Sequence, residues 1–199
     1  MTLVTNALMH VSCLQFVATV CHEMGHNNGV GHGSYRDIEY GDPWTVMGGG
    51  ESTWPSSQWI TATKWLWWWI PDSQVVHVAP PGNPHCIDCV GAGTYTIQAH
   101  DAGVLCDDVP AALRLFTSVH GETLWVETRS LYDTIKGHGM VHWVREKPSS
   151  SDQVVNGLEN TQVCYSFIQP WRVLQLPWPL EQWGMLCMCA SSVCCSVLL

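Results

Sequence analysis

The sequence predicts an α+β protein with a helical N-terminal region followed by a β-rich region. Apolar residues between positions 11 and 21 recur at the spacing of an amphipathic helix. Beyond position 79, short segments alternate polar and apolar residues and are separated by turn-forming residues, which is typical of strands. We therefore divide the chain into residues 1–78, a β-rich region of residues 79–170, and a Trp- and Cys-rich tail of residues 171–199.

Two helices are predicted in the first region. The first helix includes the apolar pattern that begins at Val11, continues through His26 and stops at Gly29, because glycine ends helices readily. The second helix runs from about Ser57 to Trp68 and ends ahead of a proline, which cannot continue a helix. A glycine-rich turn separates the two helices.

Four strands are predicted in the β-rich region: Thr94–Ala99, Leu113–Val119, Thr123–Arg129 and Met140–Arg145. The second and third of these strands are joined by a short turn at residues 120–122, so we expect them to form a hairpin. The uncharged segment of residues 184–199 is short for a membrane span. We expect a buried or poorly ordered end there; the alternative is a lipidated or GPI-type tail.

Composition excludes several classes of protein. The 199 residues carry a net charge of −9 and eight Lys and Arg residues, so no basic patch is available to bind nucleic acid. No stretch of the sequence is predicted to be a transmembrane helix. Residues 1–21 contain polar residues and lack a positively charged start, so we do not expect them to be a signal peptide.

The most informative motif is H-E-x-x-H-x-x-G-x-x-H at residues 22–32. On a helix, His22 and His26 lie on the same face and can direct their imidazoles at one metal ion. Glu23 lies beside that face, where a metal-bound water would be. Gly29 can adopt a positive φ and reverse the chain, so that His32 supplies a third ligand.

Three protein ligands leave a fourth position open for water, which is the arrangement of a catalytic zinc site. The alternative interpretation is a helix with two incidental core histidines. A further motif supports the metal site, because a methionine flanked by turn residues, Met47, follows within a segment that begins at Asp42.

The extended motif with the downstream methionine turn resembles the metzincin metalloproteases. Within that clan, His26-Asn27-x-Gly29 and the later Glu39-Tyr40-Gly41-Asp42-Pro43-x-x-x-Met47-Gly48 are similar to the gametolysin family, the algal cell-wall-lytic proteases. The resemblance extends over residues 16–50 and, more weakly, to about residue 146. It implies the C-terminal half of a metzincin-like catalytic domain, with zinc helix, Met-turn and second helix. The N-terminal half is then missing, because 21 residues precede His22, the first histidine of the motif.

The resemblance also implies a role for each residue of the motif. His22, His26 and His32 would bind Zn²⁺, Glu23 would be the general base, and Met47 would form the Met-turn beneath the metal. The implied function is zinc-dependent endopeptidase activity on extracellular or cell-wall proteins or glycoproteins, with an extracellular or cell-wall location. The alternative function is that of a catalytically inactive fragment or a non-enzymatic binding module derived from such a protease.

Two other features allow several interpretations. Cys86 and Cys89 have the spacing of a zinc knuckle or redox pair, but a second matched pair is lacking, which favours a disulfide or a plain loop. The Trp-rich run of residues 65–69 could stack on carbohydrate or lie at a membrane interface, although such a run more often packs into a core.

Overall fold

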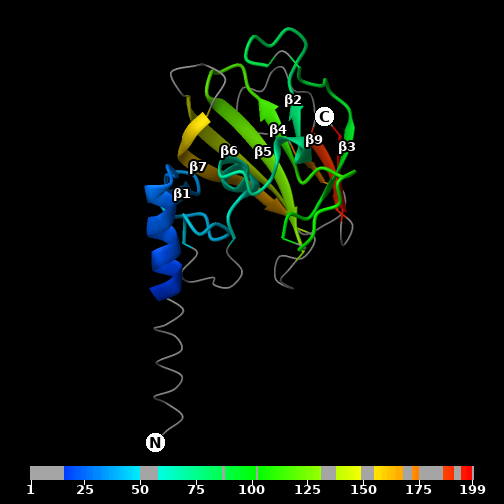
Figure 1. Cartoon of the computed structure of the whole chain (residues 1–199). Coiled ribbons are helices and arrows are strands. Elements are labelled where there is room, and N and C mark those ends of the chain that lie inside the picture. The colour runs from blue at the N-terminus through cyan, green and yellow to red at the C-terminus, as the bar shows by residue number, and fades with distance from the viewer. Residues whose placement is uncertain are drawn as a thin grey trace, which may run out of the picture.

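A computed structural model describes residues 16–49, 58–86, 88–101, 103–130, 138–148, 155–167, 172–174, 186–190 and 194–198. These residues form helices and two β-sheets, which confirms the predicted α+β class (Figure 1). The larger sheet has the strand order β1-β7-β6-β5-β4-β2, and the smaller sheet has the order β3-β10-β9-β8.

The strands have these bounds: β1 Gly33–Ser34, β2 Val75–Val78, β3 Thr94–Gln98, β4 Ala112–Phe116, β5 Glu122–Arg129, β6 His138–Pro148, β7 Val155–Phe167, β8 Arg172–Leu174, β9 Leu186–Ala190 and β10 Cys194–Leu198. Strands β4 to β7 pair antiparallel in chain order, so the centre of the larger sheet is a meander. The two edge strands, β1 and β2, pair parallel to their neighbours. The larger sheet therefore joins strands of the first region to strands of the β-rich region.

All four predicted strands are present. The hairpin between β4 and β5 is also confirmed, with Gly121 at φ 76°, a backbone conformation that favours glycine. Strand β4 ends at Phe116 rather than at Val119, because a hydrogen bond from Thr117 N–H to the Glu122 carbonyl closes the connecting turn.

Helix α3, Thr61–Leu66, is shorter than the helix predicted over residues 57–68. Its last turn closes through hydrogen bonds from Trp69 N–H and Ile70 N–H to the Lys64 carbonyl, and Trp68 adopts a φ of 61° that no right-handed helix contains. Residue 57 itself lies outside the described residues. A 3-10 helix, η1 (Asp72–Gln74), then leads into β2.

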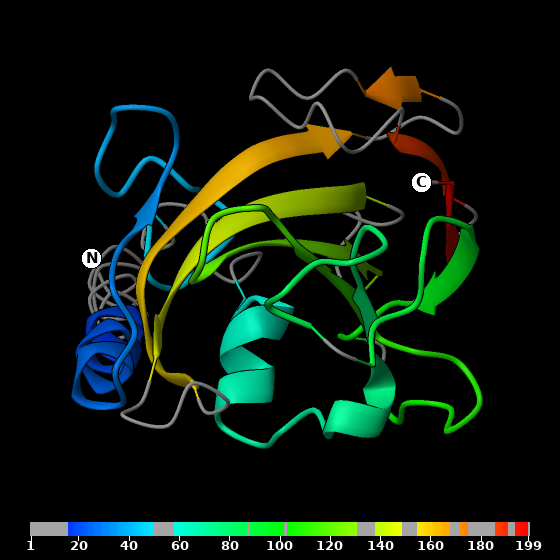
Figure 2. The same cartoon turned by 90° about the horizontal axis from the view of Figure 1, so that it is seen from above.

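The first predicted helix is described over residues 16–27, and its predicted start near Val11 lies outside the described residues. Figures 1 and 2 place this N-terminal helix beside the edge of the larger sheet that β1 and β7 form. Helix α3 packs on one face of the same sheet, where Trp65 contacts the buried ring of Trp125 at 5.5 Å between centroids. The core between them also contains Met47 and Ile60.

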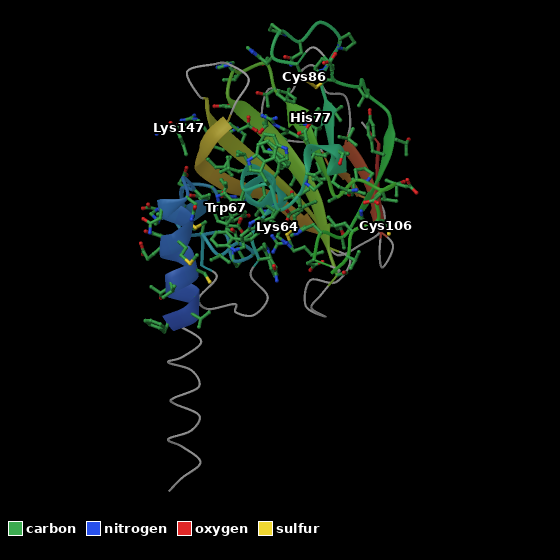
Figure 3. The ribbon with its side chains drawn as sticks, in the orientation of Figure 1. Lys64, Trp67, His77, Cys86, Cys106 and Lys147 are labelled. Carbon is green, nitrogen blue, oxygen red and sulfur yellow. A yellow bond between two sulfur atoms is a disulfide. The ribbon has the colours of Figure 1, made fainter. Side chains whose placement is uncertain are left out.

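The tryptophan run divides between the core and the surface. Trp65 and Trp67 are partly buried against the core, and the Trp67 indole donates a hydrogen bond to the Asn28 carbonyl at the end of the N-terminal helix (Figure 3). Trp68 and Trp69 are 83% and 60% exposed. Cys86 and Cys89 form a disulfide, which was one of the two favoured interpretations of that pair. Among the described residues, no helix is both long and apolar enough to cross a membrane.

Candidate metal centre

The structure brings His22, His26 and His32 together at the edge of the larger sheet. The Nε2 atom of His26 lies 3.1 Å from that of His22 and 3.0 Å from that of His32. The three rings offer one ligand atom each, and these atoms all lie within 4.8 Å of one another. Each side chain is partly exposed, so the cluster is reached from solvent.

The second nitrogen of each ring, Nδ1, faces an oxygen that accepts a hydrogen bond. The Nδ1 atoms of His22 and His26 lie 2.9 Å from the carbonyl oxygens of Val46 and Val30. The Nδ1 atom of His32 lies 2.6 Å from the Glu39 carboxylate. An Nδ1 that donates a proton to an oxygen leaves Nε2 as a bare lone pair in the neutral ring.

With this tautomer in all three rings, the Nε2 lone pairs of the histidines face one another. Such an arrangement is repulsive unless a cation is shared. Zinc sites typically contain neutral imidazoles whose other nitrogen donates to a carbonyl or carboxylate oxygen. The donor set of this chain accordingly fits a zinc ion.

Local sequence explains how the third histidine joins the other two. The spacing of four residues places His22 and His26 on one face of the N-terminal helix. Gly29 adopts a φ of 83°, as predicted, and ends the helix. The chain then pairs with β7, where Gly31 N–H donates to the Leu158 carbonyl and Leu158 N–H donates to the Gly29 carbonyl.

The loop of residues 42–48, here called the methionine loop, supports the same helix. Met47 is buried, and a Cβ atom built at Gly25 would lie 2.2 Å from its sulfur, so the helix backbone packs directly on the thioether. The loop is fastened to β1 by a hydrogen bond from Gly33 N–H to the Met47 carbonyl. Because Gly25 lies between the two helical histidines, Met47 packs under the segment that carries them.

Glu23 is exposed on the helix next to His22. Two residues that contact the cluster had no role assigned from sequence: Glu39 and Tyr40. The Tyr40 ring lies over His32 at 4.0 Å between centroids, and its φ of 60° is unusual for a bulky residue. Their place in the gametolysin-like motif was visible in the sequence, whereas their contacts depend on the turn of the chain between His32 and the methionine loop.

A buried charge cluster lies between α3 and the sheet. The Glu127 carboxylate accepts hydrogen bonds from Arg129, and at its other oxygen from the backbone N–H and hydroxyl of Thr61. The ring of His100 lies 3.3 Å from Glu127, and its Nδ1 lies 2.9 Å from the Lys64 ammonium (Figure 3). Burial raises the pKa of Glu127, but the charges of Arg129 and His100 outweigh burial and hold that pKa well below 4.5.

Burial also lowers the pKa of His100 below its ordinary value of 6.5; Glu127 opposes this shift, and Lys64 and Arg129 add to it. The unfolded protein therefore binds a proton at His100 at a higher pH than the folded protein does. We expect the free energy of unfolding to fall as pH drops through that value toward the lower pKa of the folded state.

This expectation can be measured by urea unfolding of metal-free protein at pH 7.5 and pH 5.5. The His100→Gln variant should show a smaller loss of stability between the two pH values than the wild-type protein, because glutamine does not titrate. Equal losses in the two proteins would assign the pH dependence to other groups.

Three convergent histidines, two of them on a helix with the H-E-x-x-H pattern and the third after the end of that helix, are typical of metallopeptidases. Residues 2–65 match the family model of the gametolysin peptidases M11. This match confirms the resemblance to that family over the segment that contains the three histidines and Met47, which is under half of the 199-residue chain. Neither the curated proteins nor the solved structures gave a match to the chain.

Proposed function

We propose that this protein is a zinc-dependent endopeptidase of the gametolysin type, within the metzincin clan, which hydrolyses peptide bonds of extracellular or cell-wall proteins and glycoproteins. One observation carries the proposal: three Nε2 atoms converge while each Nδ1 faces an oxygen acceptor. The match of residues 2–65 to a peptidase family supports the reaction class. The extracellular location and the substrate class come from the family resemblance.

His22, His26 and His32 would hold the metal. When bound by three histidines, zinc lowers the pKa of a bound water toward about 7 and polarises a carbonyl oxygen. Glu23 would accept the proton of the attacking water and then deliver it to the leaving amine. Its exposed position on the helix, one residue after His22, leaves its carboxylate accessible to substrate.

Met47 and its loop would keep the helix in place. The thioether fills the space under Gly25, and the loop carbonyl of Val46 orients the imidazole of His22. In this role Met47 is a packing residue of the metal site, as the Met-turn is in metzincins.

The proposal is tested first by metal content. We expect purified wild-type protein to bind one zinc per chain and to lose peptidase activity on a mixed protein substrate when a chelator removes it. The His26→Ala variant should lose at least 10-fold in zinc affinity, because it removes the central ligand of the three. His120→Ala is the matched control, since His120 is exposed and lies outside the cluster.

A wild-type protein without zinc affinity would contradict the proposal. A protein that binds zinc through these histidines but cleaves no peptide bond would favour the second candidate, a non-catalytic binding module derived from such a protease.

A further inference from the structure

We infer that Arg129, which lies on β5 outside the family-matched residues 2–65, is a positioning residue for the metal centre. The inference rests on the proposed function, because it concerns how well His22 is held as a zinc ligand. Its hydrogen bonds go to Glu127 and to the Trp44 carbonyl, and not to the three histidines. It acts through the methionine loop.

The first step is the contact between Arg129 and the loop. The side chain of Arg129 is fully buried, and its Nη1 donates a hydrogen bond to the Trp44 carbonyl. Its Nε and Nη2 donate to the same oxygen of Glu127, at 2.9 Å and 2.7 Å. The guanidinium is planar, so fixing two of its nitrogens on Glu127 also fixes the direction in which the third one points.

The second step runs from the loop to the metal ligand. Trp44 precedes Val46 by two residues, and both backbones pair with residue Gln58: Gln58 N–H donates to the Trp44 carbonyl and Val46 N–H donates to the Gln58 carbonyl. The Val46 carbonyl then accepts the Nδ1 proton of His22 at 2.9 Å. A displacement of the Trp44 carbonyl would therefore move the acceptor that sets the orientation of the His22 ring.

A second sheet residue lies beside the start of the same loop. His142, on β6, lies 3.3 Å from the Asp42 carboxylate, both side chains are fully buried, and no hydrogen bond joins them. Asp42 accepts a hydrogen bond from Trp44 N–H at 2.9 Å through its other oxygen. The N–H of Trp44 is thus held within the loop by Asp42, and its C=O is held from the sheet by Arg129.

General energetics favour a positioning role over a purely stabilising one. A buried ion pair is weak evidence for stability, because well-packed apolar side chains of similar volume are often as stable. What apolar side chains cannot provide is a directed hydrogen bond to the Trp44 carbonyl. Partners that orient a metal ligand typically contribute 10- to 100-fold to metal affinity. Since Arg129 acts one step further away, we expect an effect of about 10-fold.

The test compares two arginines of the same face of the sheet. Arg114 forms a buried ion pair with Glu146 and packs on Trp65, and among the described residues it makes no hydrogen bond or ion pair with the methionine loop. The full-length chain is purified as wild type, Arg129→Met and Arg114→Met. Zinc affinity is measured by competition with a chromophoric chelator, and the visible absorption spectrum of the Co²⁺-loaded protein reports ligand geometry. Circular dichroism and urea unfolding report the fold.

We expect Arg129→Met to bind zinc about 10-fold more weakly than wild type and to change the Co²⁺ spectrum. Arg114→Met should keep the wild-type affinity and spectrum even where it lowers stability. Arg129→Lys should fall between Arg129→Met and wild type, because one ammonium reaches Trp44 without the second anchor on Glu127. If Arg129→Met does not fold, Arg129→Lys decides with the same readouts.

A folded Arg129→Met or Arg129→Lys with wild-type zinc affinity and an unchanged Co²⁺ spectrum would overturn the inference. An equal effect in Arg114→Met would also overturn it, because the change would then report general destabilisation. A wild-type protein that binds no zinc would instead contradict the proposed function itself, so the two failures are distinguishable.

Discussion

The Glu23→Gln variant is expected to retain its zinc and lose peptidase activity by roughly 10²- to 10⁴-fold, the usual contribution of a general base. Glutamine has nearly the shape of glutamate but cannot accept a proton from water at neutral pH. Because Glu23 is exposed and is not part of the three-histidine cluster, its replacement should leave metal affinity and stability near wild type. The measurement is kcat/KM on a peptide substrate, with zinc content determined on the same sample.

Asp108→Asn provides the matched control for this change. It removes one exposed carboxylate from a loop outside the site, so it should leave kcat/KM unchanged. Wild-type activity in Glu23→Gln would assign the proton transfer to another group, whereas loss of zinc in that variant would give Glu23 a role in metal binding.

The largest effect on stability is expected from Glu127→Leu. This change leaves the Arg129 guanidinium buried without its carboxylate, and removes the acceptor of the Thr61 N–H at the start of α3. Helix α3 has no side-chain cap at the preceding residue, Ile60, and Glu127 supplies an acceptor to one of the first N–H groups, which have no partner within the helix. Breaking a buried pair on one side costs about 3–5 kcal/mol.

Urea unfolding measures the loss in the free energy of unfolding, and Glu127→Gln is the variant for comparison. The amide of glutamine still offers an oxygen to Arg129 or Thr61, so its loss should be smaller than that of Glu127→Leu. A Leu variant within about 1 kcal/mol of wild type would show that the cluster tolerates an apolar substitute, as some buried ion pairs do.

The clustering of the three histidines of the candidate site could be predicted from the sequence because their geometry is local. His22 and His26 are related by one helical turn, and Gly29 signals the reversal that precedes His32. The groups that orient these rings are less visible in a sequence. Two are backbone carbonyls, of Val46 and Val30, which any residue type could provide.

The role of the charged residues that pack against the methionine loop could not be predicted from the sequence for a similar reason. Arg129 and Glu127 stand two positions apart on β5, so they share one face, but an alternating polar pattern on a strand ordinarily indicates the solvent-exposed side. Here the face with these charges is buried under α3 and the loop. Only the tertiary arrangement reveals that the charges pair with each other.

The strands were predicted best where the two-residue period is regular. Strand β7 was not predicted, and its pairing with β6 shifts register in three places, between Val141 and His142, between Arg145 and Glu146, and between Lys147 and Pro148. Each shift breaks the alternation of side chains that a strand prediction depends on. The proposed division at residues 78/79 and 170/171 stays a prediction.

Residues 29–34, which include His32, pair with β7, so the order of synthesis decides when His32 can be positioned. Residues 29–34 exchange backbone hydrogen bonds with residues 158–162, which leave the ribosome much later. A nascent chain that ends before β7 can form the helical pair of His22 and His26, but lacks the partner strand that fixes His32. Under the proposed function such a chain would offer zinc two positioned ligands, so tight zinc binding would require a chain that includes β7.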